Sequence, residues 1–164
     1  MLKRKSDFKN LYKCMIISTL TFLGTLSAKD EIYPEFKESF NYIEVGTALP
    51  LPYPGFAIGH REKFINGSHA FDVSISYYSM IVLQDVSINT KFISYFKNNH
   101  YVSLGSCSYL GKVHDVYFVC FSPFLSYGKE YEKSFFEAAF SPIRINNYGL
   151  DFLPSLMVKY GFKY

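Results

Sequence analysis

The sequence predicts an all-β fold, an antiparallel up-and-down barrel of about eight strands preceded by an N-terminal signal helix. Apolar and polar residues alternate with a period of two over most of the chain, and turn-forming residues separate the alternating runs. The 164 residues include 17 Phe and 15 Tyr but no Trp, and only 19% are charged. Aromatic residues are enriched in strands because they pack well on a pleated surface.

The first 28 residues have the order of a secretory signal peptide. Basic residues come first, the apolar run "CMIISTLTFLGTLSA" follows, and the best cleavage site lies after Ala28. Leu26 is larger than the residue preferred three positions before a cleavage site, so an uncleaved membrane anchor is the alternative. We expect residues 29–38 to form a polar lead-in and residues 39–164 to form a single β-barrel domain.

The charge of the chain is concentrated in the predicted signal peptide. Removing residues 1–28 takes away five of the 17 basic and one of the 14 acidic side chains, so the net charge changes from +3 to −1. Nucleic-acid binding needs clustered Lys and Arg on the mature surface. We therefore expect no nucleic-acid partner.

The alternation is clearest in the first half of the barrel segment. The runs "SFNYIEVGTA" (39–48) and "FAIGHREKF" (56–64) alternate, and the proline-rich "LPLPYPG" between them lacks backbone donors and predicts a connection. Asn66-Gly67 predicts a hairpin turn into "HAFDVSISYY" (69–78), where the alternation is strict.

Five further strands complete the predicted barrel. They are "DVSINTKFISYF" (85–96), "YVSLGSCSYLG" (101–111), "DVYFVCFSPFLSYG" (115–128), "KSFFEAAFSPI" (133–143) and the closing "PSLMVKYGFKY" (154–164). The sixth strand fits least well because both of its faces are apolar and Pro123 interrupts it. A helix over "EYEKSFFEAAF" is the alternative to the seventh strand. The segment "RINNYG" is expected to be a connection.

In a membrane barrel the apolar face points to lipid and the polar face points inward. The residues expected to face lipid are Phe71, Val73, Ile75, Tyr77, Val86, Ile88, Phe92, Val158, Tyr160 and Phe162. The polar residues expected in the interior are Glu44, Arg61, Asp72, Asn89, Lys91 and Lys159. Side chains just fill an eight-stranded barrel, so we expect no conducting pore.

The same alternation also fits a secreted or periplasmic soluble β-barrel that binds an apolar ligand, with its polar face toward water. The signal peptide, the aromatic content and the closing strand favour the membrane barrel. The two interpretations differ in the direction of one face of residues 71–76: Phe71, Val73 and Ile75 point outward in the membrane barrel and inward in the soluble one.

The closing stretch "LMVKYGFKY" resembles the last strand of Gram-negative outer-membrane barrels, which alternates apolar residues and ends in an aromatic. The resemblance implies that Tyr160, Phe162 and Tyr164 form a C-terminal signal for the barrel-assembly machinery. The order "EVGTALPLPYPGFAIGHR", "FDVSISYY", "YGKEYEKSFFEAAFSP" and "VKYGFKY" resembles a family of small uncharacterised exported envelope proteins of chlamydia-related bacteria. That family implies an envelope location and no known activity.

Cys107 and Cys120 are the cysteines that follow the predicted signal peptide, and they lie on adjacent predicted strands. An exported chain meets an oxidising compartment, so a disulfide between them is possible. Two buried free thiols that act as small apolar residues are the alternative.

Residues that carry chemistry are not arranged for catalysis. A lipid hydrolase on such a barrel would pair a His with a Ser, but His60 is predicted on the face opposite to Asp72 and Ser74. Glu130 and Glu132 are predicted in a solvated turn, and no His spacing suits a metal. We expect no catalytic residue, metal or cofactor, and a non-enzymatic outer-membrane protein with a structural or surface-interaction role, its partners being membrane lipid and the assembly machinery.

Overall fold

A computed structural model describes residues 38–49, 52–64, 67–80, 83–113, 116–146, 149–152 and 154–164. The predicted signal peptide lies outside the described residues, and so does the predicted lead-in apart from Glu38. The barrel strands are β1 (Phe40–Leu49), β2 (Tyr53–Phe64), β3 (His69–Ser79), β4 (Leu83–Phe96), β5 (His100–Val113), β6 (Val116–Glu130), β7 (Ser134–Ser141) and β10 (Ser155–Lys163). The 3-10 turn η1 (Lys97–Asn99) joins β4 to β5.

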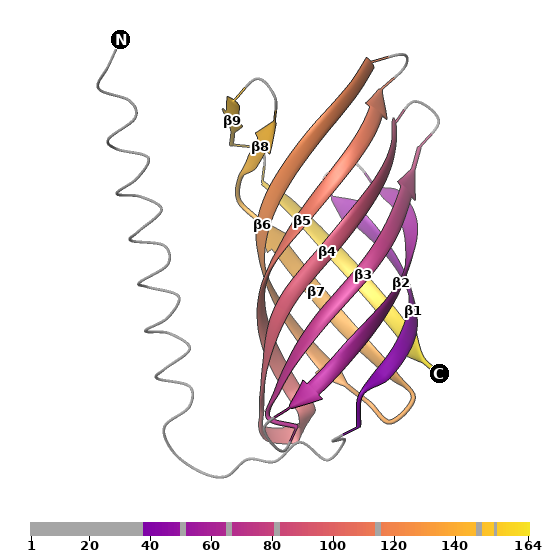
Figure 1. Ribbon diagram of the computed structural model, residues 1–164, viewed down its shortest axis with the longest axis vertical. Helices are drawn as coiled ribbons and strands as arrows, with labels where there is room; N and C mark the ends of the chain where they lie inside the picture. The colour runs from indigo at the N-terminus through magenta and orange to yellow at the C-terminus, as the bar shows by residue number, and fades with distance from the viewer. Residues whose placement is uncertain are drawn as a thin grey trace, which may run out of the picture. The chain divides into compact units, whose positions relative to one another are not determined.

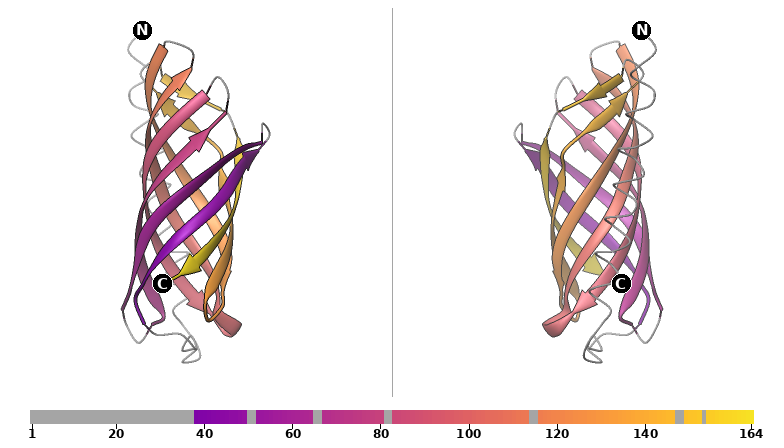
Figure 2. Two further views of the ribbon diagram at one scale, coloured as in Figure 1. Left: turned by 90° about the vertical axis from the view of Figure 1, so that its right-hand side faces the viewer. Right: turned by 90° about the vertical axis from the view of Figure 1, so that its left-hand side faces the viewer.

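These eight strands form one closed antiparallel barrel, as predicted (Figures 1 and 2). Each strand pairs with the next along the chain from β1 to β7, β7 pairs with β10, and β10 pairs with β1. Closure satisfies the backbone donors and acceptors of both edges, which an open sheet leaves unpaired. The seventh predicted segment is therefore a strand rather than a helix.

Two short strands extend the sheet beyond the barrel. The predicted connection "RINNYG" contains β8 (Arg144–Asn146) and the first residue of β9 (Gly149–Asp151), two strands that the sequence did not predict. β8 pairs with β6 at Cys120 and Phe121. The hairpin forms because β6 is longer than β7 and leaves part of its edge for a new partner.

Pro123 lies where β6 changes partner. Residues 125–130 of β6 pair with β7, and residues 120–121 pair with β8. Pro123 lies between these two ladders, so its missing backbone donor interrupts neither of them. The hydroxyl of Ser141 donates to the carbonyl oxygen of Pro123 over 2.8 Å. β6 therefore accommodates Pro123, the residue that made the sixth strand the poorest fit to a strand pattern in the sequence.

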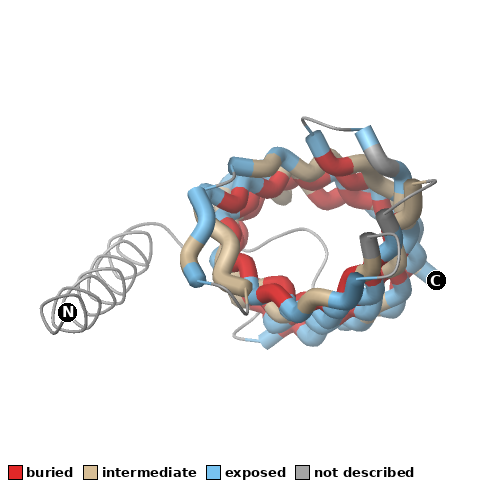
Figure 3. Tube along the Cα trace, turned by 90° about the horizontal axis from the view of Figure 1, so that it is seen from above, coloured by how far each residue is buried: buried red, intermediate tan, exposed pale blue. Residues whose placement is uncertain are grey.

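The alternation of β3 fixes which face looks inward. Exposed fractions are 45%, 39% and 54% for Phe71, Val73 and Ile75, and 1%, 4% and 2% for Asp72, Ser74 and Ser76. Buried positions recur around the whole ring when the barrel is seen along its length (Figure 3). The apolar face of β3 therefore points outward and the polar face points into the barrel.

A continuous belt of apolar side chains surrounds the outer face. Ile58, Ile75 and Ile88 lie side by side on β2, β3 and β4, and each is more than half exposed. Every barrel strand contributes at least one exposed large apolar residue. We call this surface the apolar belt. Among the described residues, no helix is both long and apolar enough to cross a membrane.

The two ends of the barrel differ. At one end, here the turn end, β2, β4, β6 and β10 finish (Figure 1). At the other, the loop end, β1, β3 and β5 finish, and β8 and β9 lie there as well (Figure 1). At the β4–β5 turn, Asn98 and Asn99 have φ of 62° and 59°, a left-handed conformation that Asn tolerates.

Six glycines on the strands face an aromatic ring directly across the ladder. The pairs are Gly59–Tyr42, Gly128–Tyr101, Gly161–Phe135, Gly55–Tyr78, Gly111–Phe118 and Gly105–Phe124. A Cβ atom on any of these glycines would come within 2.1–2.6 Å of its ring. We call them the glycine–aromatic pairs. Because the glycines lack side chains, the rings can lie against the barrel wall.

Candidate functional site

The residues predicted to face lipid lie on the outer face. Eight are exposed or half-exposed within the apolar belt on β3, β4 and β10, and Tyr160 and Phe162 continue it toward the turn end. The ring centroids of Tyr160 and Phe162 are 4.9 Å apart in an edge-to-face contact. Tyr164 is exposed, and its backbone N–H donates to the carbonyl of Asn41 on the first strand. Contact of these residues with lipid stays a prediction.

The six polar residues predicted inside are all buried. They are Glu44, Arg61, Asp72, Asn89, Lys91 and Lys159. Ionised groups are buried only when partners compensate their lost hydration, so their contacts decide what the interior does.

Arg61 is the centre of the interior near the turn end. Its Nε donates to Asp72 Oδ2 over 2.8 Å, and its Nη1 lies 3.4 Å from Glu130 Oε2. Its Nη2 lies 4.0 Å from Glu137 Oε2. The side chain of Arg61 is fully buried, and three carboxylates from β3, β6 and β7 surround it. The guanidinium therefore ties together strands that are not neighbours in the barrel.

The position of Glu130 differs from the one predicted from the sequence. The sequence places it in a solvated turn, but β6 continues through residue 130 and turns its side chain into the barrel. Lys63 Nζ donates to Glu130 Oε1 over 2.6 Å, and Lys163 Nζ donates to the same oxygen over 2.8 Å. The hydroxyl of Tyr95 donates to the other oxygen. Glu130 is thus a fully compensated interior carboxylate rather than a surface charge.

Glu137 is an interior residue that the sequence analysis did not single out. Lys91 Nζ lies 2.5 Å from Glu137 Oε2, and the hydroxyl of Tyr101 donates to the same oxygen over 2.9 Å. The sequence pattern could have identified Glu137, because it is the polar residue between Phe136 and Ala138 in an otherwise apolar strand.

The buried ionic groups near the turn end form one cluster, which we call the charged plug. It contains three positive and three negative groups: Arg61, Lys63, Asp72, Lys91, Glu130 and Glu137.

Three glycine–aromatic pairs hold the rings that surround Arg61. Its Cζ atom lies 4.5 Å from the ring centroid of Phe135, 4.9 Å from that of Tyr101 and 5.9 Å from that of Tyr42. A cation over an aromatic face is stabilised by the ring quadrupole, more so where water is excluded. Tyr42 also donates to Asp72 over 2.7 Å. The rings therefore replace part of the hydration that Arg61 loses.

A second layer of polar side chains occupies the middle of the barrel, between the charged plug and the loop end. Lys159 Nζ lies 3.1 Å from Glu44 Oε1 across the β1–β10 seam. Asn89 Nδ2 donates to the hydroxyl of Ser76 over 3.0 Å, and Ser76 bonds to Ser87 over 2.5 Å. This layer separates the charged plug from the space above it.

A cavity of about 200 Å³ occupies the interior at the loop end. We call it the loop-end cavity. Its apolar lining includes Leu49, Tyr109, Met157 and the rings of the other three glycine–aromatic pairs, and its polar lining includes Asp85, Ser87, Asn89, Arg144 and Lys159. The cavity is mostly apolar with a few polar groups, which is the usual composition of small-molecule sites.

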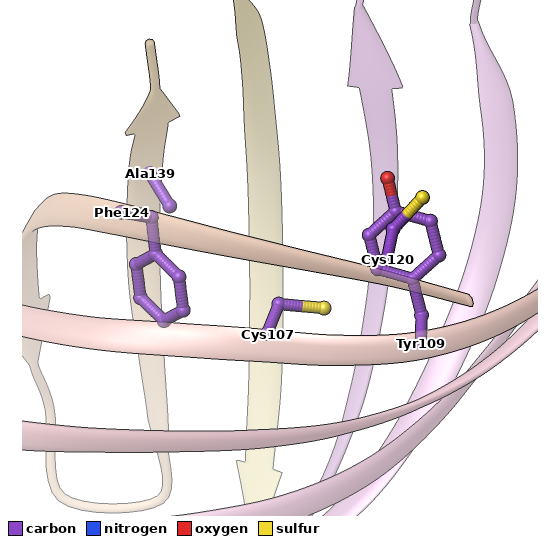
Figure 4. Packing of buried hydrophobic residues seen from close by; sticks show 5 residues of the cluster. All are labelled: Cys107, Tyr109, Cys120, Phe124 and Ala139. Atoms are coloured by element: carbon purple, nitrogen blue, oxygen red, sulfur yellow. The ribbon is translucent and has the colours of Figure 1, made fainter. Parts of the chain in front are cut away.

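The two cysteines belong to the wall of this half of the barrel. Cys107 and Cys120 are buried free thiols, and Figure 4 shows them with Tyr109 and Phe124 on β5 and β6. Cys107 faces Ser122 and Cys120 faces Tyr109, so the thiols are diagonal neighbours. Diagonal Cα atoms are about 7–8 Å apart, beyond the usual disulfide range. The possible disulfide is therefore absent from this structure.

His60 does not meet the interior polar groups. His60 lies on the outer face, where its Nδ1 is 2.8 Å from Asn41 Oδ1 and its Nε2 is 3.0 Å from Glu62 Oε2. Asp72 and Ser74 lie inside, so the strands separate the members of a possible triad, as the alternation predicts. His114 lies outside the described residues. Within the described part of the chain, no three His, Cys, Asp or Glu side chains are placed to hold a metal ion.

No family model and no curated protein matches the chain. Among solved structures, the chain is similar to the outer membrane protein Ail of Yersinia pestis in a phospholipid bilayer nanodisc, with a TM-score of 0.49 and 11% sequence identity. The match covers 77% of this chain and 100% of that chain. The assignment of an eight-stranded barrel rests on the strand pairings of this chain itself.

Proposed function

We propose that the protein is exported to the outer membrane of a Gram-negative envelope, spans it as an eight-stranded barrel, and acts there as a non-enzymatic structural or surface-interaction protein. The proposal includes cleavage of residues 1–28 after Ala28. It also includes recognition of Tyr160, Phe162 and Tyr164 by the barrel-assembly machinery. The envelope proteins of chlamydia-related bacteria, which the sequence resembles, fit the same location.

The apolar belt is the observation that carries this proposal. Soluble monomers rarely expose contiguous apolar patches of more than a few hundred Å². Here exposed large apolar side chains come from all eight barrel strands, while the charged plug takes up ionic groups inside. A soluble barrel that binds an apolar ligand would need the opposite distribution, with a polar outer face. The belt therefore favours lipid as the solvent of the outer face.

The strand lengths suit a bilayer as well. A tilted strand needs about 9–11 residues to cross the hydrocarbon region. β1 has 10 residues and β10 has 9. Because the strand number is even, the barrel begins and finishes at the turn end, which we assign to the periplasmic side. The loop end then faces the cell exterior.

Replacement of Ile75 by Lys tests the location of the belt. At the middle of a bilayer a Lys on the lipid face destabilises a barrel by about 2–4 kcal/mol. In water, a surface substitution at a side chain that is already 54% exposed would stay within about 0.5 kcal/mol. We expect the larger loss, measured by urea unfolding in lipid vesicles, together with less of the compact, heat-modifiable band on gels.

The matched control is Phe152→Lys, because Phe152 is 78% exposed but lies between β9 and β10, outside the barrel strands. This variant should unfold like the wild type. Wild-type protein should also stay with membranes after carbonate extraction. Equal stability of both variants, or release of the protein in soluble form, would overturn the membrane proposal.

A further inference from the structure

The loop-end cavity has walls that keep it open. The rings of Tyr78, Phe118 and Phe124 line it, and each faces a glycine on the neighbouring strand. The absence of a side chain beneath each ring lets the ring lie against the wall instead of filling the centre. The space of about 200 Å³ is therefore a consequence of the strand sequences and not of a missing side chain at one position.

One cation of this cavity, Arg144, forms no ion pair within the described part of the chain. Lys159 at the floor is paired with Glu44 over 3.1 Å. Arg144 at the loop end forms no ion pair with any described residue, and its Nε is buried without a hydrogen-bond partner there. Asp151, directly across from Arg144 in the β8–β9 ladder, accepts a hydrogen bond from Asn146 over 2.5 Å instead.

The position of Arg144 depends on the β8–β9 hairpin. The hairpin continues the sheet from the edge of β6, and this places the Cζ atom of Arg144 5.2 Å from the ring centroid of Tyr109. Tyr109 in turn meets Phe118 edge to face at a centroid distance of 6.1 Å. The guanidinium is thus anchored against an aromatic wall of the cavity, with donor capacity left over.

We propose that the loop-end cavity binds a small amphipathic anion, with a flat apolar body of about one substituted aromatic ring and one carboxylate that pairs with Arg144. An apolar cavity of about 150 Å³ is enough for benzene, so this cavity has room for a ring with a short side chain. Arginine presents a planar fork of donors that matches a carboxylate. Contact with the apolar walls stabilises the bound ring, and pairing with Arg144 favours an anion over a neutral molecule of the same shape.

The inference concerns the inside of the barrel, so it does not depend on what covers the outer face. Its failure would leave the membrane proposal intact, and the reverse also holds. The binding test uses purified folded protein, whereas the membrane proposal is tested by urea unfolding in lipid vesicles and by carbonate extraction.

Two probes of equal shape test the proposal, the anion 3-phenylpropanoate and its neutral amide. The reporter is the ε-methyl resonance of Met157, which lines the cavity, in protein labelled with [¹³C-methyl]methionine. Met80 does not line the cavity and provides the internal reference. We expect the anion to shift the Met157 resonance saturably and to bind at least tenfold more tightly than the amide.

Variants separate the roles of charge and space. Arg144→Gln should weaken binding of the anion at least tenfold and leave the amide unchanged, whereas Lys97→Gln, at the other end of the barrel, should change neither. Ala48→Phe, which fills the cavity, should remove the response to both probes while the barrel still shows its heat-modifiable band. The proposal is wrong if the anion leaves Met157 unmoved in the wild type, or if Arg144→Gln binds both probes like the wild type.

Discussion

Arg61 shows how one residue can organise a barrel interior. Its guanidinium contacts carboxylates from three strands and four aromatic rings, and none of its side chain is exposed. Attraction between buried charges mainly offsets the loss of hydration. The arrangement therefore stabilises the barrel only while every partner is present, and removing one partner leaves others uncompensated.

Replacement of Arg61 by Met is expected to destabilise the protein by about 3–5 kcal/mol, the usual cost of breaking a buried ion pair on one side. Asp72 and Glu130 would then lack much of their compensation. Urea unfolding in vesicles measures the loss. Lys97→Met, at an exposed turn position, is the control and should leave stability unchanged. A loss below about 1 kcal/mol for Arg61→Met would mean that the charged plug contributes little.

The inward direction of the Arg61 side chain could be predicted from the sequence, but that of the Glu130 side chain could not. Arg61 occupies the polar position of a clearly alternating strand, so its direction follows from the period of two. Glu130 has Lys129 and Glu132 close by, and such a charged run looks like a solvated turn. Only the length of β6, which is set by its pairing with β5 and β7, turns Glu130 inward.

At the scale of strands, the glycine–aromatic pairs link register to packing. Each pair needs the glycine and the ring to stand directly opposite each other, so a slip of one residue would break all pairs on that ladder. Three pairs hold rings around Arg61 and three line the loop-end cavity. The same local device therefore builds both halves of the interior.

Gly128→Ala tests this device. A Cβ atom there would lie 2.3 Å from Cζ of Tyr101, so the ring must move and lose its hydrogen bond to Glu137. We expect a loss of about 1–3 kcal/mol, as for overpacked cores. The smaller side chain of Tyr101→Leu should relieve the clash, so the double variant should lose less than the sum of the two single variants. Strict additivity in urea unfolding would contradict the contact.

Two features of the strands could not be predicted from the sequence, because they depend on how the strands pair. The disulfide between Cys107 and Cys120 depends on the β5–β6 register, and a shift of two residues decides between facing and diagonal positions. β8 and β9 have three residues each, too few for a period of two to be recognised. In contrast, the eleven residues of β3 alternate without a break and predict both of its faces.

For the whole molecule, the interior determines whether ions can pass. The charged plug occupies the lumen near the turn end with side chains from β2, β3, β4, β6 and β7, and its carboxylates are buried. Eight-stranded barrels leave an interior that side chains just fill. The loop-end cavity is therefore closed below rather than continuous through the barrel.

We expect the purified protein to give no unitary current steps in planar lipid bilayers at ±100 mV, because the plug leaves no continuous water path. The absence of steps must be accompanied by proof of folding, which the heat-modifiable band of the same protein preparation provides. Regular steps that survive in several preparations would show that the plug opens.

The sequence alone predicts the all-β class and the number of barrel strands, but not which solvent the outer face meets. A soluble and a membrane barrel share the same alternation, because both separate an apolar face from a polar one. The difference lies in which face the closed sheet turns inward, and curvature of the sheet follows from pairings between strands far apart in the chain. β1 and β10, for example, are more than 100 residues apart.

The pairing of β1 with β10 has a consequence for biogenesis. This seam joins the earliest and latest strands through eight residue pairs, and a further backbone bond runs from Tyr164 to Asn41. Until β1 pairs with β10, the nascent sheet has two edges with unpaired backbone N–H and C=O groups. Such edges can form hydrogen bonds with other chains. A fragment that lacks β10 would keep unpaired edges on β1 and β7, and we expect it to aggregate or to be degraded by quality-control proteases.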